Sequence, residues 1–337
     1  MAELGILQHG GQIRAAAARY GIAMDDWLDL STGINPIPFI PPEIPLAAWA
    51  RLPQEHDGQR DGLEEAATRY YGTPDLLPVS GSQAAIQLLP RLRNRCRAGV
   101  LHPGYAEHAH AWRSAGHEVE GLCASEIGAQ INNLDVLVLM QPNNPTGEVF
   151  SHTQLHEWHT QLAARGGWLI VDEAFIEASM QASFAPPQMP QGLIVLRSLG
   201  KFFGLAGARV GFVLAHAGLL ARLRAALGPW SVAGPSRHVA QAALLDSDWQ
   251  ATTRTRLLHD GARLAQLLCD AGLRPAGGCG LFQWVLAEQA EAIHQQLAER
   301  GIFTRLFAQP RSVRFGLPGS TAEWSRLGAA LAQVLPA

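Results

Sequence analysis

The stretch from Ser198 to Gly211 reads S-L-G-K-F-F-G-L-A-G-A-R-V-G and joins two apolar, strand-like runs through a glycine-rich loop. Lys201 in this loop is the only lysine of the 337-residue chain. A lone lysine is consistent with a surface charge in an arginine-biased composition. Its neighbours favour chemistry, because Ser198 and Arg209 in the same stretch are suited to holding a phosphate. An amine beside a phosphate site suggests a lysine that forms a Schiff base with pyridoxal phosphate.

The composition predicts an ordinary globular protein. Hydrophobic residues make up 47% of the chain, so a substantial core can be buried. A formal net charge of −3 without basic runs argues against nucleic acid and anionic membranes as principal partners, and small molecules are expected instead. The sequence has no cationic, apolar signal sequence and no apolar run of the ~20 residues that a membrane span needs, so we expect a cytoplasmic protein.

Neither the cysteines nor the histidines form a metal-binding pattern. The four cysteines are widely spaced, with no C-x-x-C pair, which favours reduced buried thiols over disulfides or a zinc site. His108 and His110, like the group His152, His156 and His159, lack a supporting carboxylate pattern. We expect these histidines to be surface or half-buried residues, and no metal site.

Short β-rich runs alternate with helical patterns through the first two thirds of the chain. The expected strands cover residues 76–79, 99–101, 117–122, 135–140, 168–172, 193–198 and 210–214. This alternation predicts an α/β fold with a mainly parallel sheet, helices on both faces and a ligand site at the carboxyl ends of the strands. The candidates at those ends are Tyr105, Asn144, Asp172, Ser198 and Lys201. Tyr105 could instead be a packing residue and Asp172 a helix cap.

A second phosphate-binding signal follows the run at residues 76–79. Gly81, Ser82 and Gln83 lie in a loop that feeds a helix with apolar residues on one side. Backbone amides at such a helix start are unpaired and favour an anion. A serine there is also an ordinary N-cap, so this signal is weak by itself.

The remaining chain predicts a smaller α+β domain. A long amphipathic helix is expected over residues 248–272, and strands over 280–286, 302–305 and 312–317. Ser320 with Glu323 resembles a capping box that starts a last helix. We expect a large domain over residues 46–235, a small C-terminal domain over 236–337, and an N-terminal segment, 1–45, that joins the small domain and covers the active site.

Three motifs in order carry a family resemblance: Q-P-N-N-P-T-G at residues 141–147, V-D-E-A-F at 171–175 and the lysine stretch itself. Together they resemble pyridoxal-phosphate enzymes of the aspartate-aminotransferase fold, the class I/II aminotransferase family, over nearly the full length. H-G-G-Q-I-R at His9, S-T-G-I-N-P at Ser31 and P-W-S-V at Pro229 are most similar to the L-threonine-O-3-phosphate decarboxylases of cobalamin biosynthesis, which are themselves similar to histidinol-phosphate aminotransferases. The resemblance implies a mainly parallel, seven-stranded sheet and a homodimer.

The resemblance also implies roles for the cofactor residues. Lys201 would form the Schiff base, Asp172 would hold the protonated pyridine nitrogen, and Tyr105 would stack on the ring. Asn144 would hold the phenolic oxygen, with Asn144–Pro145 as a candidate cis peptide bond. The phosphate would be bound by Gly81, Ser82, Gln83, Ser198 and Arg209.

For the substrate, the resemblance assigns the α-carboxylate to Arg314 through a bidentate pair. His9, Gly10 and Asn35 fit the region that covers the substrate phosphate, and Asn144 belongs to the substrate site as well. Arg14 and Arg305 are further candidates.

Two positions depart from the family pattern. Phe175 stands where aminotransferases usually have a tyrosine that donates to the phenolic oxygen, although the decarboxylase relatives share the phenylalanine. Leu52 stands in R-L-P where relatives read R-Y-P, and their tyrosine reaches across a dimer to the cofactor phosphate. We therefore expect that cross-subunit contact to be absent or replaced.

The expected reaction is decarboxylation of O-phospho-L-threonine to (R)-1-amino-2-propanol O-2-phosphate. The alternative is an aminotransferase acting on a phosphorylated amino acid such as histidinol phosphate, in which Lys201 removes the Cα proton. The site residues serve both reactions, and only the resemblance favours decarboxylation. A non-catalytic sensor or scaffold is a third class, which the retention of Lys201, Asp172, Asn144 and Arg209 disfavours.

Overall fold

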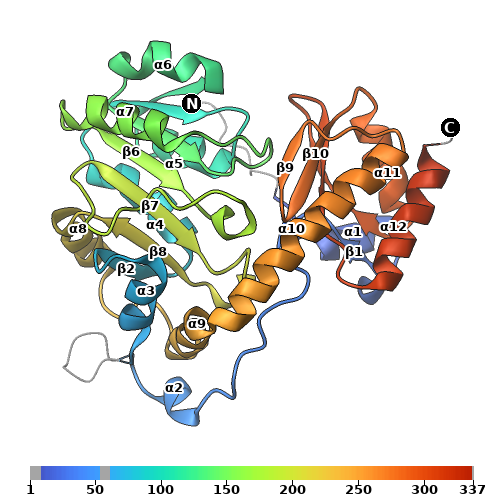
Figure 1. Ribbon diagram of the computed structural model, residues 1–337, viewed down its shortest axis with the longest axis horizontal. Coiled ribbons are helices and arrows are strands. Elements are labelled where there is room, and N and C mark those ends of the chain that lie inside the picture. Colours follow the sequence, from blue (N-terminus) through green and yellow to red (C-terminus); the bar gives the residue numbers. More distant parts are fainter. Residues whose placement is uncertain (1–8, 54–60, 336–337) are drawn as a thin grey trace. The chain divides into compact units, whose positions relative to one another are not determined.

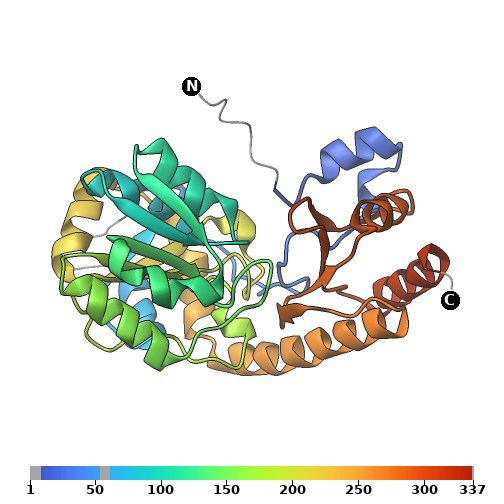
Figure 2. The ribbon, with the colours of Figure 1, turned by 90° about the horizontal axis from the view of Figure 1, so that it is seen from above.

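The computed structural model describes residues 9–53 and 61–335, and these fall into two compact units. The sheet unit consists of the described parts of residues 38–144 and 148–254. The terminal unit consists of the described parts of residues 1–37, 145–147 and 255–337. Figures 1 and 2 show the ribbon in two views.

The described part of the sheet unit is built on a seven-stranded sheet with the order β2-β8-β7-β6-β5-β3-β4. The strands are β2 (Leu76–Val79), β3 (Arg97–Leu101), β4 (Glu118–Leu122), β5 (Val136–Met140), β6 (Trp168–Asp172), β7 (Leu193–Ser198) and β8 (Gly211–Ala215). β8 runs antiparallel to β2 and β7, and the other pairings are parallel. The predicted mainly parallel α/β sheet is confirmed. β5 and β6 are buried along their whole length, as continuous apolar runs in a sheet covered on both faces should be.

Helices pack on both faces of this sheet (Figures 1 and 2). The helices in the described part of the sheet unit are α2 (Leu46–Ala50), α3 (Leu63–Tyr71), α4 (Ser82–Leu88), α5 (Ala106–Ser114), α6 (Ile127–Gln130), α7 (His152–Ala163), α8 (Ala217–Leu227) and α9 (Gly234–Leu245). α3 ends at Gly72, whose φ of 74° places it in the left-handed region that favours glycine. On one face, Ile86 of α4 and Trp112 of α5 pack with sheet residues such as Val138 into the core.

The terminal unit combines both ends of the chain. Its described part has an antiparallel sheet of order β12-β13-β10-β9 and a parallel pair, β1-β11. The strands are β1 (Leu28–Asp29), β9 (Gly277–Cys279), β10 (Phe282–Leu286), β11 (Ile302–Phe303), β12 (Arg305–Phe307) and β13 (Ser312–Gly316). Leu28 pairs with Ile302, so the N-terminal segment belongs to the same unit as the C-terminal strands.

The helices of the terminal unit are α1 (Ile13–Tyr20), α11 (Ala290–Ala298) and α12 (Thr321–Val334). α10 (Ser247–Asp270) begins in the sheet unit and ends in the terminal unit. Ser320 caps α12 and forms the predicted capping box with Glu323. No helix in the described ranges is long and apolar enough to cross a membrane.

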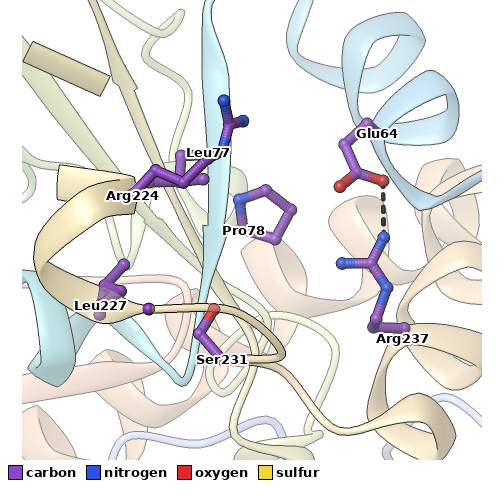
Figure 3. Close-up of a pocket in the computed structure, with 8 residues that line it drawn as sticks. Glu64, Leu77, Pro78, Arg224, Leu227, Ser231 and Arg237 are labelled. Atoms are coloured by element: carbon purple, nitrogen blue, oxygen red, sulfur yellow. Dashed lines mark hydrogen bonds and ion pairs between the residues drawn. The ribbon is translucent and has the colours of Figure 1, made fainter. Parts of the chain in front are cut away.

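The unit boundaries differ from the domain boundaries expected at residues 45 and 235, because the units change at 37/38 and 254/255. The segment after residue 37 is tied to the sheet unit, where Phe39 N donates to Phe203 O at 2.9 Å. α9 packs on α3 and α2, and Arg237 of α9 pairs with Glu64 of α3 at 2.7 Å (Figure 3). α9 therefore belongs to the sheet unit rather than to the small domain.

Candidate active site

The cofactor candidates lie along one edge of the large sheet. Asp172 is the last residue of β6 and Ser198 the last residue of β7, with Lys201 three positions later. Tyr105 follows β3, and Asn144 follows β5. Since these four strands run parallel, their carboxyl ends share one edge. The structure thus brings together the candidates that the sequence placed at strand ends.

Asp172 is buried and paired with a histidine. Its Oδ2 lies 2.9 Å from His108 Nε2, and its Oδ1 accepts a hydrogen bond from Ala174 N at 3.1 Å. An ionised carboxylate only accepts, so the imidazole donates to it. His108 is itself buried, and the expectation of a surface or half-buried residue is wrong because α5 directs this side chain to the sheet edge. Sequence reasoning missed this pairing.

The other histidines do not join this site. His159 is also buried, against the expectation, and its Nε2 contacts Gln191 O at 3.0 Å. His152 and His156 are exposed on α7. Within the described ranges no cluster of three or more His, Cys, Asp or Glu side chains is arranged to hold a metal ion. The four cysteines are free thiols, but their expected burial is wrong, because Cys123 and Cys269 are exposed and Cys96 and Cys279 are half-buried.

The turn at Gly81 and the guanidinium of Arg209 form a tight pair. Gly81 has a φ of 76°, and a Cβ there would lie 2.7 Å from Arg209 Nη2. Gly211 is equally close to this turn, because a Cβ at Gly211 would lie 2.6 Å from Ser82 N. Arg209 itself has a φ of 53°. A left-handed backbone costs a non-glycine residue about 1–2 kcal/mol, and such strain marks a site whose surroundings enforce it.

The side chain of Gln83 contacts other side chains of the site. Its Oε1 accepts a hydrogen bond from Tyr105 OH at 3.3 Å, and its Nε2 donates to Glu107 Oε2 at 2.7 Å. The carboxamide of Gln83 is therefore engaged with other side chains at both ends. The Ser198 hydroxyl oxygen accepts a hydrogen bond from Gly200 N at 3.2 Å, which shapes the start of the lysine loop.

Lys201 lies beside the residue that replaces the usual tyrosine. Its Nζ is 5.4 Å from the centroid of the Phe175 ring, and that ring is fully buried. A cation at this distance from an aromatic face is attracted by the ring. Phe175 thus holds the amine without offering a hydrogen-bond donor.

The Q-P-N-N-P-T-G segment differs from expectation at its prolines. Where the structure describes the chain, cis bonds precede Pro103, Pro142 and Pro310, and the expected cis bond at Asn144–Pro145 is wrong. Asn144 is half-buried after β5. Its neighbour Asn143 is buried and donates from Nδ2 to Pro103 O at 2.8 Å, so the turn is fixed by Asn143.

Apart from Asn144, the substrate candidates belong to the terminal unit. Arg314 lies buried on β13, directly opposite Arg305 of β12. Burial and then the charge of Arg305 lower the pKa of Arg314 to about 10, so its guanidinium is still charged at pH 7. Arg314 also donates to Ser31 O and lies 5.1 Å from the centroid of the Phe282 ring. Like charges placed directly opposite across a ladder are unfavourable, so this pair is suited to an anionic ligand.

Ser31 fixes the H-G-G-Q segment in place. The fully buried Ser31 accepts a hydrogen bond from Gly11 N at 2.8 Å and donates to Asp29 Oδ1 at 2.6 Å. A Cβ at Gly10 would lie 2.4 Å from Ser31 O, so only glycine fits there. Gly10 and Gly11 are therefore held against Ser31. His9 is half-buried next to them.

Asn35 is buried and held through its carboxamide oxygen. Asn35 Oδ1 accepts hydrogen bonds from Ile37 N at 3.0 Å and from Arg256 Nη2 at 2.9 Å. Arg14, by contrast, is exposed on α1.

Three residues that contact the candidates escaped the sequence analysis: Glu107, Ser31 and Arg256. Ser31 stands inside a motif that the sequence analysis quoted, and Glu107 stands two residues after Tyr105. For Ser31 and Glu107, their proximity to a quoted motif or to Tyr105 was the signal that could have identified them. Arg256 is far along the chain from Asn35, and no spacing rule connects the two.

Known proteins are similar to this chain in sequence and in fold. The family model "Aminotransferase class I and II" matches residues 56–331. A threonine-phosphate decarboxylase of Pseudomonas aeruginosa is 55% identical over 97% of both chains, and one of a Sinorhizobium species is 42% identical over 97% of this chain and 98% of its own. The solved structure of histidinol-phosphate aminotransferase from Sinorhizobium meliloti, in complex with pyridoxal-5'-phosphate, has a TM-score of 0.82 at 21% identity, covering 99% of this chain and 96% of that one. The chain belongs to the class I and II aminotransferase family and, within it, to the threonine-phosphate decarboxylases.

Proposed function

We propose that this protein decarboxylates O-phospho-L-threonine, with pyridoxal phosphate as cofactor, to carbon dioxide and (R)-1-amino-2-propanol O-2-phosphate, a step of cobalamin biosynthesis. The observation that carries the chemistry is the placement of the single lysine on the same sheet edge as the buried Asp172–His108 pair. The choice of substrate is supported by the kinship with the decarboxylases of Pseudomonas and Sinorhizobium.

The residues present fit pyridoxal phosphate. Gly81 leaves no room for a side chain beside Arg209. The Arg209 guanidinium therefore lies against the backbone of this turn, and a guanidinium together with backbone amides is what a phosphate requires. Asp172 offers a buried acceptor for a protonated ring nitrogen. Tyr105 would supply the ring platform and Asn144 the group that holds the phenolic oxygen.

When bound, the cofactor supplies an aldehyde that joins the substrate amine and a protonated ring that accepts the electron pair released at Cα. Asp172 would keep the proton on the ring nitrogen, and His108 holds the carboxylate by donating to its Oδ2. Loss of carbon dioxide would break the bond from Cα to the carboxylate carbon. Lys201 Nζ would deliver the proton that replaces the carboxylate at Cα, and the same amine would displace the product amine from the cofactor.

The substrate's charges match the terminal unit. Arg314 binds the α-carboxylate and sets its direction, which decides the bond that breaks. His9, Gly10 and Asn35 bind around the substrate phosphate, and Arg305 adds charge beside Arg314. Arg314→Lys tests the bidentate role, because lysine keeps the charge and loses the fork. We expect a raised KM with a smaller change in cofactor affinity.

We further propose a cytoplasmic homodimer. The location rests on the sequence. The dimer is supported by apolar side chains of and near α2: Leu46 is 80%, Trp49 65% and Leu52 64% exposed. Such a cluster is unfavourable in water and suits an interface between copies. Sedimentation of the wild type and of Trp49→Asp measures the oligomeric state, and a monomeric wild type would contradict the proposed dimer.

The deciding experiment offers O-phosphothreonine to the loaded enzyme and follows carbon dioxide and oxo-acid separately. Carbon dioxide without oxo-acid supports the proposal. Oxo-acid without carbon dioxide refutes it in favour of the aminotransferase, and turnover to neither refutes the substrate. Lys201→Ala controls for the lysine, and a wild type that shows no visible cofactor absorbance would indicate a sensor or scaffold instead.

A further inference from the structure

The first turn of α5 carries three side chains that reach different parts of the candidate site. Tyr105 directly precedes the helix, Glu107 is its second residue and His108 its third. His108 reaches Asp172, whereas Glu107 reaches Gln83 of α4. Glu107 has no role in the proposed reaction, yet its side chain is buried, with 8% of its surface exposed.

The chemistry of the three groups fixes the direction of this chain of hydrogen bonds. A carboxylate only accepts, so Glu107 Oε2 requires the NH2 group of Gln83 at its distance of 2.7 Å. The carboxamide oxygen of Gln83 must then face the other way, where it accepts from Tyr105 OH at 3.3 Å. The two ends of an amide are similar in size, so its hydrogen-bond partners decide which way it faces. Glu107 decides the orientation of the Gln83 amide.

We propose that Glu107 is a positioning residue that acts through the carboxamide of Gln83 on the hydroxyl of Tyr105. It makes Tyr105 OH a hydrogen-bond donor and so fixes the ring plane of the aromatic platform. The same link ties that platform to the turn at Gly81, since Gln83 lies in the first turn of α4. The inference rests on the proposed function only for what the ring of Tyr105 stacks on.

The first arm of the test needs no cofactor. The chain has four tyrosines, so protein labelled with 13C at tyrosine Cζ gives four signals, and Tyr105→Phe identifies the one from residue 105. In cofactor-free protein, Glu107→Gln frees the amide to turn over and should shift or broaden this signal alone. Glu157→Gln, which removes an exposed carboxylate on α7, is the matched control and should move none of the four.

The second arm is a double-mutant cycle on the loaded enzyme. Glu107→Gln should lower kcat about two- to tenfold, the range of one hydrogen bond, with KM for O-phosphothreonine nearly unchanged. In the Tyr105→Phe background, Glu107→Gln should have no further effect, because the hydroxyl on which it acts is gone. Gln83→Leu breaks the link from the other side and should not add to Glu107→Gln.

An unmoved Tyr105 signal in Glu107→Gln overturns the proposal even if the enzyme proves to have another substrate. An equal loss of kcat in the wild-type and Tyr105→Phe backgrounds also overturns it, since Glu107 would then act on the fold alone. If Glu107→Gln does not fold, Gln83→Leu carries both arms by itself.

Discussion

Arg197→Met should destabilise the fold strongly and in a pH-dependent way. Arg197 on β7 is buried and donates to Glu173 Oε2 at 2.8 Å and to Glu177 Oε1 at 2.6 Å. Its guanidinium carbon also lies 4.7 Å from the centroid of the Tyr71 ring. Both carboxylates are buried. Glu173 directly follows Asp172, so this triad of Arg197, Glu173 and Glu177 adjoins the sheet edge that carries the cofactor candidates.

The magnitude follows from the two hydrogen bonds that a methionine side chain cannot donate. Hydrogen bonds between charged groups contribute about 1.5–3 kcal/mol each, or about 3–6 kcal/mol for the pair. Burial of the apolar methionine side chain offsets part of this. The expected net loss in the free energy of unfolding is about 3–5 kcal/mol, which is typical when buried carboxylates lose their cation.

The pH dependence has a definite sign. Burial raises the pKa of Glu173, and the charge of Arg197 opposes that rise. A carboxyl group whose folded pKa is raised contributes full stability below its unfolded pKa and loses it as pH rises through the folded pKa. Arg197→Met removes the opposing charge and raises the pKa of Glu173 further. The destabilisation should therefore be larger at about pH 8 than at about pH 5, where protonation relieves the buried charge.

Urea unfolding of cofactor-free protein at both pH values, monitored by circular dichroism, measures the free energy of unfolding of the wild type and of Arg197→Met. Arg91→Met, which removes an exposed arginine, is the control and should change the free energy of unfolding by less than about 0.5 kcal/mol. A loss below about 1 kcal/mol for Arg197→Met would show that the triad is not a net source of stability. A loss that is equal at both pH values would refute the role of Glu173.

Two further predictions concern the sheet edge that carries the cofactor candidates. His108→Leu should lower kcat by about tenfold to a hundredfold, because the hydrogen bond that His108 donates to the charged Asp172 is removed, and unchanged steady-state decarboxylation would contradict this. Gly81→Ala should weaken pyridoxal-phosphate binding, because its Cβ would displace the guanidinium of Arg209. Gly72→Ala imposes a similar backbone strain, with a φ of 74° but nothing within 4 Å of the added Cβ, so equal cofactor affinity in the two variants would refute the steric explanation.

Local patterns were enough to predict most of the sheet unit. The strand at residues 168–172 is an apolar run that ends in Asp172, the strand at 193–198 is an apolar run that ends in Arg197 and Ser198, and the structure has the same bounds. Pairing partners were not predictable in this way. The expected strand at 302–305 is divided, because Ile302 and Phe303 pair with β1 whereas Arg305 pairs with β13.

The sequence placed the site on the sheet edge but did not predict how its side chains meet. Strand ends are set by apolar periodicity, so Asp172 and Ser198 could be located from their positions alone. Whether a helix turns a side chain toward that edge depends on how it packs on the sheet. That is why the sequence predicts a surface or half-buried position for His108 but locates Tyr105, three residues earlier, correctly.

Backbone strain in the described chain concentrates around one turn. Among the residues that the structure describes, Arg209 and Trp230 are the two non-glycine residues with positive φ, at 53° and 61°. Arg209 packs against Gly81, and Ser231, the neighbour of Trp230, accepts a hydrogen bond from Ser80 Oγ. Both strained positions therefore adjoin residues 80–81. A strained backbone persists only where its surroundings enforce it, so the fold gives up stability at the turn where the proposed function needs a rigid phosphate site.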